Sequence, residues 1–437
     1  MRTRKLVVAA LAALLFGAAP DAARAGAGPH ASRAVHPVAP QAITADSLRL
    51  FLVTFGPGAA VWERFGHNAL WIHDPMAGTD VAYHYGIFDM SEEGFMVKFL
   101  QGRMFYSMGS ANAPAMLDVY RRYGRDATIQ ELRLTRDQIG ELEAFLQWNL
   151  LPENRIYRYD YFRDNCSTRI RDALDRVLGG TVREALAPLP STLTYRGQAV
   201  ALTAEDQVLT TAMDLGLGPL ADQPISHWEL AFIPMRLRDD LRRVAVERDG
   251  VRIPLVAAQR HLPAIGEPDE DLGVTPQETS PRGRALWHLL LGLLIGAGFA
   301  LAARLARDAA KPALRRAAAW ALGLGGAAWG LVAGVMGLIL LGLWTLTDHE
   351  FAWRNENLLQ ANPLALALVA LAPLAVRRAG SAWATRVAGA LVGLSLFGLF
   401  LHPLPVTPQA NIPIIALTLP VHLGLFWALW KVGRPRP

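Results

Sequence analysis

The feature that most constrains this chain is a series of apolar segments that fills its last third. Five of them follow residue 284, at about 285–303, 318–344, 363–376, 387–401 and 412–430. A helix needs roughly 20 apolar residues to cross the hydrocarbon core of a bilayer. Because the third and fourth segments are short, the sequence predicts an α-helical transmembrane bundle of about five spans, with four or six left open.

The basic residues between these segments predict the orientation of the helices. They cluster after the first, third and fifth segments, as Arg304, Arg307, Lys311, Arg315, Arg316, Arg377, Arg378, Arg386, Lys431, Arg434 and Arg436. The opposite loops, 345–362 and 402–411, contain a single arginine. Cytoplasmic loops carry the excess of basic residues. We therefore expect a multi-pass protein of the inner membrane, with its N-terminal region in the periplasm and its C-terminus in the cytoplasm.

Composition agrees with this interpretation. Hydrophobic residues make up 52% of the 437 residues and charged residues 19%, a balance typical of membrane proteins. The formal net charge is +5, from 43 basic and 38 acidic residues. Because the basic excess lies mainly beside apolar helices, it indicates membrane topology and no nucleic-acid partner.

The first 25 residues have the pattern of a secretory signal peptide. Arg2, Arg4 and Lys5 precede an apolar run over 6–19, and Ala23-Arg24-Ala25 fits a cleavage site. An uncleaved membrane anchor is the alternative. Either reading predicts that the following region is exported.

Between the signal peptide and the apolar segments, the pattern predicts an α+β domain over 44–184. Short apolar runs suited to strands lie at 48–54, 69–72, 87–88 and 129–134, and amphipathic helices are expected over 135–150 and 165–178. A helical extension over 185–262 and a linker over 263–284 follow, the linker being rich in acidic residues and proline. The membrane domain is expected over 285–437.

Two segments of the predicted α+β domain could carry chemistry. In 64–72, His67 follows a glycine and begins an apolar, strand-like run. In 159–169, Cys166, the sole cysteine of the chain, opens a predicted helix. The positive end of a helix lowers the pKa of a thiol from about 8.5. A neighbouring imidazole can take its proton. The pattern indicates a cysteine nucleophile with a histidine base, an inert buried cysteine being the alternative.

These segments also carry a family resemblance. The stretches FGHNALWI, DVAYHYGIFDM and PENRIYRYDYFRDNCSTRIRD resemble the N-terminal periplasmic domain of the Lnb family of bacterial lipoprotein N-acyltransferases. The order of histidine before cysteine is similar to the circularly permuted, lecithin retinol acyltransferase-like branch of the NlpC-type papain-like superfamily. The resemblance continues through ADQPISHWELAFIPMRL and TDHEFAWRNENLLQANPL.

The resemblance implies a permuted papain-like (NlpC/LRAT-like) domain and a transacylation without a cofactor or a metal. Cys166, activated by His67, would take an acyl chain from a membrane phospholipid. It would then pass the chain to the α-amine of a diacylated lipoprotein. His84 is the candidate third catalytic residue, although the family pattern more often has asparagine at its position.

Polar residues around the cysteine complete the expected site. Asp164, Asn165, Tyr161 and Arg169 are expected to contact substrate, and Arg169 could meet a lipid phosphate. For Asp164 and Asn165, capping of the helix is the favoured alternative.

Other interpretations stay open. The same dyad could hydrolyse a phospholipid or peptidoglycan, or the domain could be a non-catalytic scaffold. The polar loop over 348–357 could recognise a lipid headgroup or the catalytic domain, cap a helix, or bind a metal through Asp348, His349 and Glu350. The acyl donor also stays open, because the acyl group could come from a phospholipid or from the lipoprotein itself.

Overall fold

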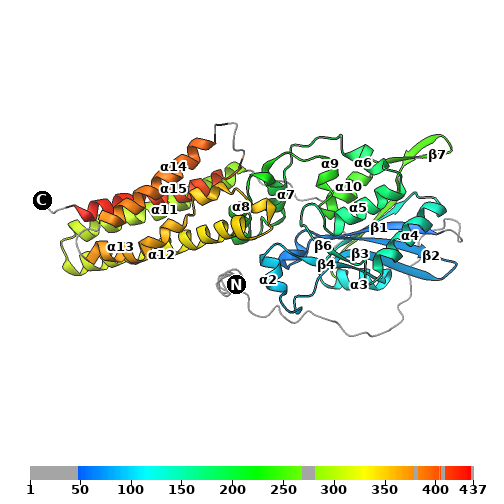
Figure 1. Cartoon of the computed structure of the whole chain (residues 1–437), viewed down its shortest axis with the longest axis horizontal. Coiled ribbons are helices and arrows are strands. Elements are labelled where there is room, and N and C mark those ends of the chain that lie inside the picture. Colours follow the sequence, from blue (N-terminus) through cyan, green and yellow to red (C-terminus); the bar gives the residue numbers. More distant parts are fainter. Residues whose placement is uncertain (1–47, 268–280, 378–381, 403, 405–408, 435–437) are drawn as a thin grey trace. The chain divides into compact units, whose positions relative to one another are not determined.

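The computed structural model describes residues 48–267, 281–377, 382–402, 404 and 409–434 (Figure 1). The predicted signal peptide, most of the predicted linker, and Arg378 and Arg436 of the basic clusters lie outside the described residues. The chain divides into two compact units. The first combines the residues up to Ser191 with Ser226–Thr275, and the second combines Thr192–Ile225 with Pro276–Pro437.

The first unit is built on a seven-stranded antiparallel sheet with the strand order β6-β4-β3-β2-β1-β5-β9. The strands are β1 (Arg49–Phe55), β2 (His67–Asp74), β3 (Thr79–Ile87), β4 (Phe105–Asn112), β5 (Ala127–Leu132), β6 (Ile156–Arg158) and β9 (Val256–Leu262). All four predicted strand segments fall on or at the end of these strands. Six of the seven residues of β1 are buried, because helices cover both faces of the sheet.

The helices form a layer on each face. On one face, α4 (Arg136–Leu150) and α5 (Cys166–Val177) pack against β1 and β2. On the other face, α3 (Ala113–Arg122) packs on the remaining side chains of these strands. The shorter elements are η1 (Val61–Glu63), α2 (Phe95–Leu100), α6 (Thr181–Leu186), α9 (His227–Leu230), α10 (Pro234–Leu241) and the hairpin of β7 (Ala245–Arg248) and β8 (Val251–Pro254). The predicted α+β class is confirmed.

Local capping explains where the two main helices start. Thr135 and Asn165 each accept hydrogen bonds from the first turn of the following helix. Each forms a capping box with the third helical residue, which satisfies backbone donors that have no partner within the helix. Both helices therefore lie where the sequence pattern predicts them.

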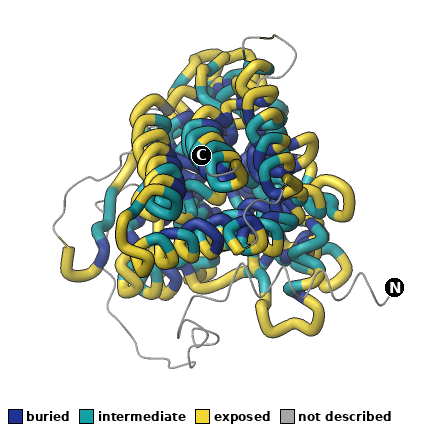
Figure 2. The backbone as a smooth tube through the Cα atoms, turned by 90° about the vertical axis from the view of Figure 1, so that its left-hand side faces the viewer, coloured by how far each residue is buried: buried dark blue, intermediate teal, exposed yellow. Residues whose placement is uncertain are grey.

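The second unit contains long apolar helices: α11 (Pro281–Asp308), α12 (Pro312–Leu346), α14 (Ala382–Leu401) and α15 (Ile412–Gly433). These four helices of the described part are long and apolar enough to cross a membrane, judged by length and composition. Their outward faces remain exposed (Figure 2), as expected of helices that contact lipid.

The third predicted span is not one regular helix. Segments η4 (Glu356–Leu359), η5 (Pro363–Leu366) and α13 (Ala367–Arg377) replace it, and residues 350–359 and 363–377 meet at a bend of 54°. If this pair counts as one span, the total is five. Pro363 follows the bend directly, and the residue before a proline is disfavoured in helical conformation.

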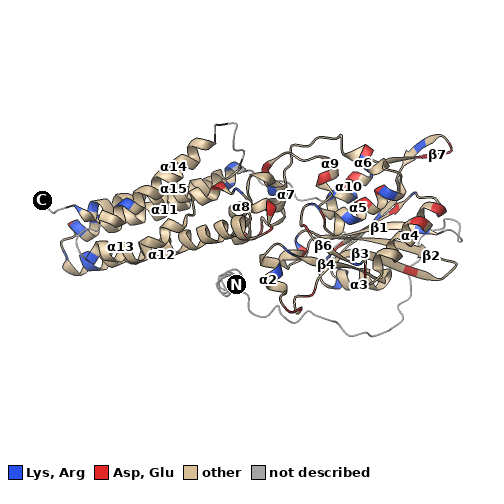
Figure 3. Cartoon of the chain, in the orientation of Figure 1, with Lys and Arg blue, Asp and Glu red and all other residues tan. Residues whose placement is uncertain are grey.

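The basic clusters lie at one end of the long helices (Figure 3). Arg307 of α11 donates hydrogen bonds to the backbone carbonyls of Lys431 and Arg434 at the end of α15. Arg377 of α13 lies over the ring of Trp320 near the start of α12, 4.8 Å from its centre. The clusters after the first, third and fifth segments therefore share an end, as the charge pattern predicts.

The region predicted as a helical extension, 185–262, is divided between the two units. Residues 192–225 form α7 (Tyr195–Leu202), α8 (Gln207–Gly216) and η2 (Pro219–Asp222) in the second unit. The later part includes β9, which pairs with β5 at the edge of the main sheet. The sequence VAAQRHL of β9 lacks an alternating apolar pattern because the strand has no fully buried residue.

Candidate active site

Two histidines from neighbouring strands meet at one end of the sheet. His67 is the first residue of β2, and His84 lies near the end of β3. His67 Nε2 and His84 Nδ1 are 3.0 Å apart and share a hydrogen bond. The two histidines are therefore in direct contact.

Aromatic side chains hold the His67 ring in place. The ring of Tyr120, from α3, lies nearly parallel to the imidazole, with centroids 5.9 Å apart and an angle of 13°. Phe55, opposite His67 on β1, stacks on both rings. Because three rings pack together, the imidazole has little freedom to turn away from its hydrogen bond.

Cys166 is the first residue of α5, as the sequence predicts. Its neighbour Asn165 accepts hydrogen bonds from the backbone N–H groups of Ser167 and Thr168, at 2.9 and 3.0 Å. The amide of Asn165 also donates to the carbonyls of Tyr161 and Phe232. These bonds occupy the buried Asn165 side chain, so the geometry favours a cap over a substrate contact.

The thiol faces the strands that carry the histidines. A Cβ atom added at Gly86 of β3, which has a φ of +89°, would lie 3.2 Å from the Cβ of Cys166. The backbone N–H of Asn68, the residue after His67, forms a hydrogen bond to the thiol sulfur. The half-buried cysteine therefore packs against both the strand of His67 and that of His84.

Burial controls the protonation of this group of residues. It raises the pKa of the Cys166 thiol to about 11, against the lowering effect of the Asn68 N–H and the Arg125 charge. Burial also lowers the pKa of His84 to about 4. Burial, and after it the charges of His84 and Arg125, hold the pKa of His67 well below its ordinary value. The predicted lowering of the thiol pKa is therefore wrong, since desolvation of the thiol outweighs the effect of the helix start.

Arg125 is a residue of the site that the sequence pattern did not reveal. Its guanidinium is buried, donates to the carbonyl of Gly56 at 2.8 Å and lies 4.7 Å from the ring centre of Tyr120. Its nearest carboxylate oxygen, of Glu63, is 4.0 Å away. An arginine in a turn between helix and strand ordinarily faces water, so no local signal distinguishes this one.

Comparison with protein families identifies both parts of the chain. Residues 37–196 match the model of the Lnb N-terminal periplasmic domain, and residues 323–431 match that of the Lnb transmembrane domain. The two matches together cover more than half of the chain. The chain belongs to the Lnb family. It is thus a membrane-associated enzyme of the Lnb type with a periplasmic N-terminal domain. Neither a curated protein nor a solved structure gives a significant match.

The other predicted site residues of this Lnb domain serve the helix that carries the cysteine. Asp164 and Arg169 form a two-bond ion pair at 2.6 and 2.8 Å. Arg169 also lies 3.7 Å from the ring centre of Tyr157, and Tyr161 packs on Phe162 and on the core. A lipid phosphate would have to compete with Asp164 for Arg169.

The polar loop of the Lnb transmembrane part caps a helix. The side-chain amides of Asn355 and Asn357 donate to the carbonyls of Asp214, Leu215 and Gly216 at the C-terminal end of α8. These carbonyls have no partner within a helix, so the asparagines satisfy them. Among the described residues, no group of three or more histidine, cysteine or acidic side chains could hold a metal.

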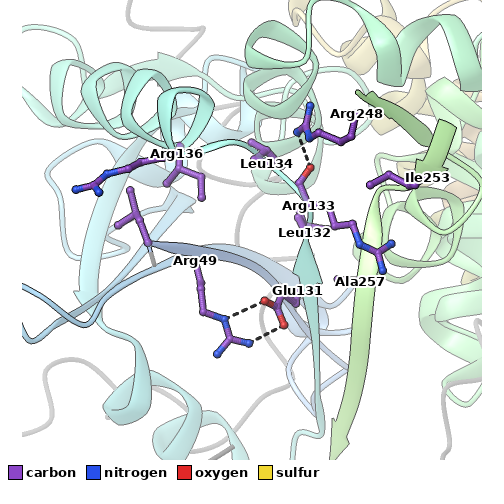
Figure 4. Close-up of a pocket in the computed structure, with 11 residues that line it drawn as sticks. Arg49, Glu131, Leu132, Arg133, Leu134, Arg136, Arg248, Ile253 and Ala257 are labelled. Atoms are coloured by element: carbon purple, nitrogen blue, oxygen red, sulfur yellow. Dashed lines mark hydrogen bonds and ion pairs between the residues drawn. The ribbon is translucent and has the colours of Figure 1, made fainter. Parts of the chain in front are cut away.

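A surface pocket of the Lnb periplasmic domain lies at the other end of the sheet (Figure 4). Arg49 lines this pocket and donates hydrogen bonds to both carboxylate oxygens of Glu131. Arg49 begins β1, whereas Phe55, the partner of His67, ends it. This pocket is therefore remote from the cysteine, and Arg49 and Glu131 within it are already paired with each other.

Proposed function

We propose that this protein is a lipoprotein N-acyltransferase. It would move an acyl chain from a membrane phospholipid, through a thioester on Cys166, to the α-amine of an N-terminal diacylglyceryl-cysteine. One observation supports this most directly: the sole cysteine opens a helix against the two strands whose histidines are hydrogen-bonded to each other. The Lnb transmembrane match supports a lipid donor.

In the first half-reaction, the thiol attacks the ester carbonyl of the phospholipid. The pKa values favour a neutral thiol and neutral imidazoles at rest. His67 therefore takes the thiol proton as the sulfur–carbon bond forms, which is general base catalysis. With Nε2 bonded to His84, Nδ1 is the nitrogen for this proton. The carbon–oxygen bond to glycerol then breaks, and the same proton passes to the leaving oxygen to give a lysophospholipid.

Backbone N–H groups can stabilise the negative oxygen that forms in this step. The N–H groups of Asn68 and Cys166 both act on the thiol sulfur, and each lowers the thiol pKa. An ester carbon bonded to this sulfur would place its oxygen within the same region. Donors fixed before the reaction stabilise such charge without reorganisation.

In the second half-reaction, the acceptor amine replaces the sulfur on the acyl carbon. The neutral α-amine attacks the thioester, the carbon–sulfur bond breaks, and the electron pair leaves on sulfur. His67 takes a proton from the attacking nitrogen and returns it to the thiolate. An amide forms, and the enzyme recovers its starting state.

The second candidate function is hydrolysis by the same residues. Water would replace the amine, as in a phospholipase or a peptidoglycan amidase or peptidase. The half-buried position of Cys166 and the membrane helices favour a lipid substrate over a soluble cell-wall polymer.

The test uses cells depleted of their own lipoprotein N-acyltransferase. The protein is expressed as wild type, as Cys166→Ala and as His67→Ala, and the N-terminal peptide of a model lipoprotein is analysed by mass spectrometry. The proposal predicts an amide-linked acyl chain with wild type and none with either variant at equal abundance. An unmodified amine with wild-type protein, accompanied by free fatty acid, would support hydrolysis instead.

A further inference from the structure

Exposed apolar side chains surround the end of the sheet that holds the thiol. Trp62 is 51% exposed and Met90 48%, and Val61 and Ile87 are also exposed. These residues belong to the end of β3 and to the segments after β1 and β3. Both segments leave the sheet at the end where His67 begins β2. Exposed apolar surface of this kind often marks a ligand or membrane site.

A row of aromatic rings leads from the interior to this surface. Tyr159 stacks on Tyr106 at 4.2 Å between centroids, and Tyr106 stacks on Phe88 at 5.0 Å. Phe88 meets Trp62 edge to face at 6.2 Å. Tyr159, Phe88 and Cys166 all pack against the same core.

The segment that carries Phe88 also packs against Cys166. Gly86, whose missing side chain leaves room for Cys166, comes two residues before Phe88 in the chain. Ile87, between them, lies over Gly109 of β4. The segment from Gly86 to Phe88 therefore links the surroundings of the thiol to the exposed apolar residues.

The segment after β3 is held in shape although its apolar residues face water. Asp89 accepts hydrogen bonds from the N–H and the hydroxyl of Ser91 at 2.8 and 2.6 Å. Phe88 stacks on Phe95 of α2 at 5.8 Å, and Glu92 pairs with Lys98. Met90 is therefore exposed on a loop that is fixed by hydrogen bonds and ring contacts, directly after Ile87 at the end of β3.

We propose that Val61, Trp62, Ile87 and Met90, with Phe88 beneath them, bind the acyl chain of the lipid that acylates Cys166. We call these five residues the acyl-chain patch. The inference rests on the proposed function and names the part of the donor lipid that the site recognises. The occupant is an acyl chain because Ile87 and Phe88 of the patch directly follow Gly86, which packs against Cys166, the residue that must carry the acyl group. A row of aromatic and aliphatic side chains offers it apolar contact without bonds to a headgroup.

The test measures how fast the sole cysteine of the full-length, detergent-solubilised protein is acylated. The donors are p-nitrophenyl butyrate and p-nitrophenyl palmitate, and intact-protein mass spectrometry follows the adduct. The readout is the ratio of the palmitate rate to the butyrate rate. Since all variants share one detergent, partitioning of the donor into micelles cancels between them.

Trp62→Ala and Met90→Ser remove exposed side chains of the patch. The ratio is expected to fall at least tenfold in Trp62→Ala and severalfold in Met90→Ser, and to recover largely in Trp62→Phe. Trp148→Ala is the matched control, because Trp148 is 54% exposed on α4 of the same unit. Its ratio should equal that of wild type.

The outcomes separate this inference from the proposed function. If Cys166 is acylated in all variants and every ratio lies within twofold of the wild-type ratio, the acyl-chain patch is wrong. The proposed roles of Cys166 and His67 are then unaffected. A wild-type protein that neither donor acylates overturns both. If Trp62→Ala changes the oligomeric mass of the protein and leaves the ratio unchanged, the surface is an interface between two copies, and the inference is wrong.

Discussion

The side chain of Asn68 donates a hydrogen bond of 3.0 Å to the hydroxyl of Ser167, and both residues are fully buried. Asn68 follows His67 in β2, and Ser167 follows Cys166 in α5. Ser167 in turn donates to the carbonyl of Ala231 at 2.6 Å. A hydrogen bond between the residues that follow His67 and Cys166 therefore ties the segment of the proposed base to that of the proposed nucleophile.

This bond predicts coupled effects of two substitutions. Asn68→Ala and Ser167→Ala should each lower the free energy of unfolding by about 1–3 kcal/mol, because each leaves a buried polar group without its partner. The double variant should lose less than the sum of the two, as residues in direct contact do. Chemical denaturation measures the free energies of unfolding, and the rate of Cys166 acylation measures the effect on the site. Additive losses would show that the bond does not couple the segments.

Gly86 gives a prediction about space beside the thiol. Gly86→Ala meets both a φ of +89° and the Cβ of Cys166 at 3.2 Å, so it should reduce acyl transfer at least tenfold. The matched control is Gly78→Ala, in the turn between β2 and β3, which has a φ of +65° and no neighbouring atom within 4 Å. Both variants should lose about 1–3 kcal/mol of stability through backbone strain. Equal activities of the two would contradict the tight packing of Gly86 on Cys166.

The raised thiol pKa predicts how Cys166 responds to pH. Alkylation by iodoacetamide should be slow at neutral pH and should increase up to about pH 11. Folding favours the protonated thiol, so its contribution to stability is complete below about pH 9 and is lost as the pH rises through about 11. Cys166→Ala should remove this part of the alkaline slope. Rapid alkylation that has already levelled off at pH 7 would show a thiolate at rest.

Arg125 should act on the dyad through its charge. Its guanidinium lowers the pKa of both Cys166 and His67. In Arg125→Met, the alkylation profile should therefore move to higher pH, and Arg125→Lys should restore part of the shift. Arg122→Met, at an exposed arginine of α3 that pairs with Asp118, is the control. If the pH profile of alkylation does not move in Arg125→Met, the charge of Arg125 does not act on Cys166, and the role of this arginine is its hydrogen bond to Gly56.

His84 should matter as a hydrogen-bond partner of the His67 ring. His84→Asn keeps a polar group near His67 Nε2, whereas His84→Ala removes it. The group bonded to one ring nitrogen fixes the tautomer and orientation of an imidazole, and for metal-bound histidines its loss costs roughly ten- to a hundredfold. Acyl transfer should therefore fall at least tenfold in His84→Ala and much less in His84→Asn. Equal loss in both variants would mean that the imidazole of His84 itself is required.

Local patterns were sufficient to predict the helix that carries Cys166 and the helix that packs beside it. Thr135 and Asn165 are strong helix caps, and the helices begin where these residues predict. Long-range features could not be predicted from the same patterns. Strand β9 has no fully buried residue to create an alternating pattern, and its pairing with β5 joins residues more than 120 positions apart.

The site shows the same division. His67 and Cys166 were predicted from local context and His84 from the family resemblance, and the two histidines are in direct contact. Asn68, Ser167 and Arg125 were not, because their roles depend on burial and on partners distant in sequence. The sign of the thiol pKa shift was mispredicted for the same reason: a helix start is visible in the sequence, whereas desolvation is a property of the folded site.

The most direct test of the central claim follows the acyl group from donor to acceptor. Purified protein is reconstituted in vesicles with a phospholipid carrying an isotopically labelled acyl chain and a synthetic diacylated lipopeptide. Mass spectrometry should find the label as an amide on the lipopeptide α-amine, with an equal amount of lysophospholipid, and neither product with Cys166→Ala. Labelled free fatty acid without labelled amide would contradict acyl transfer and identify the protein as a hydrolase.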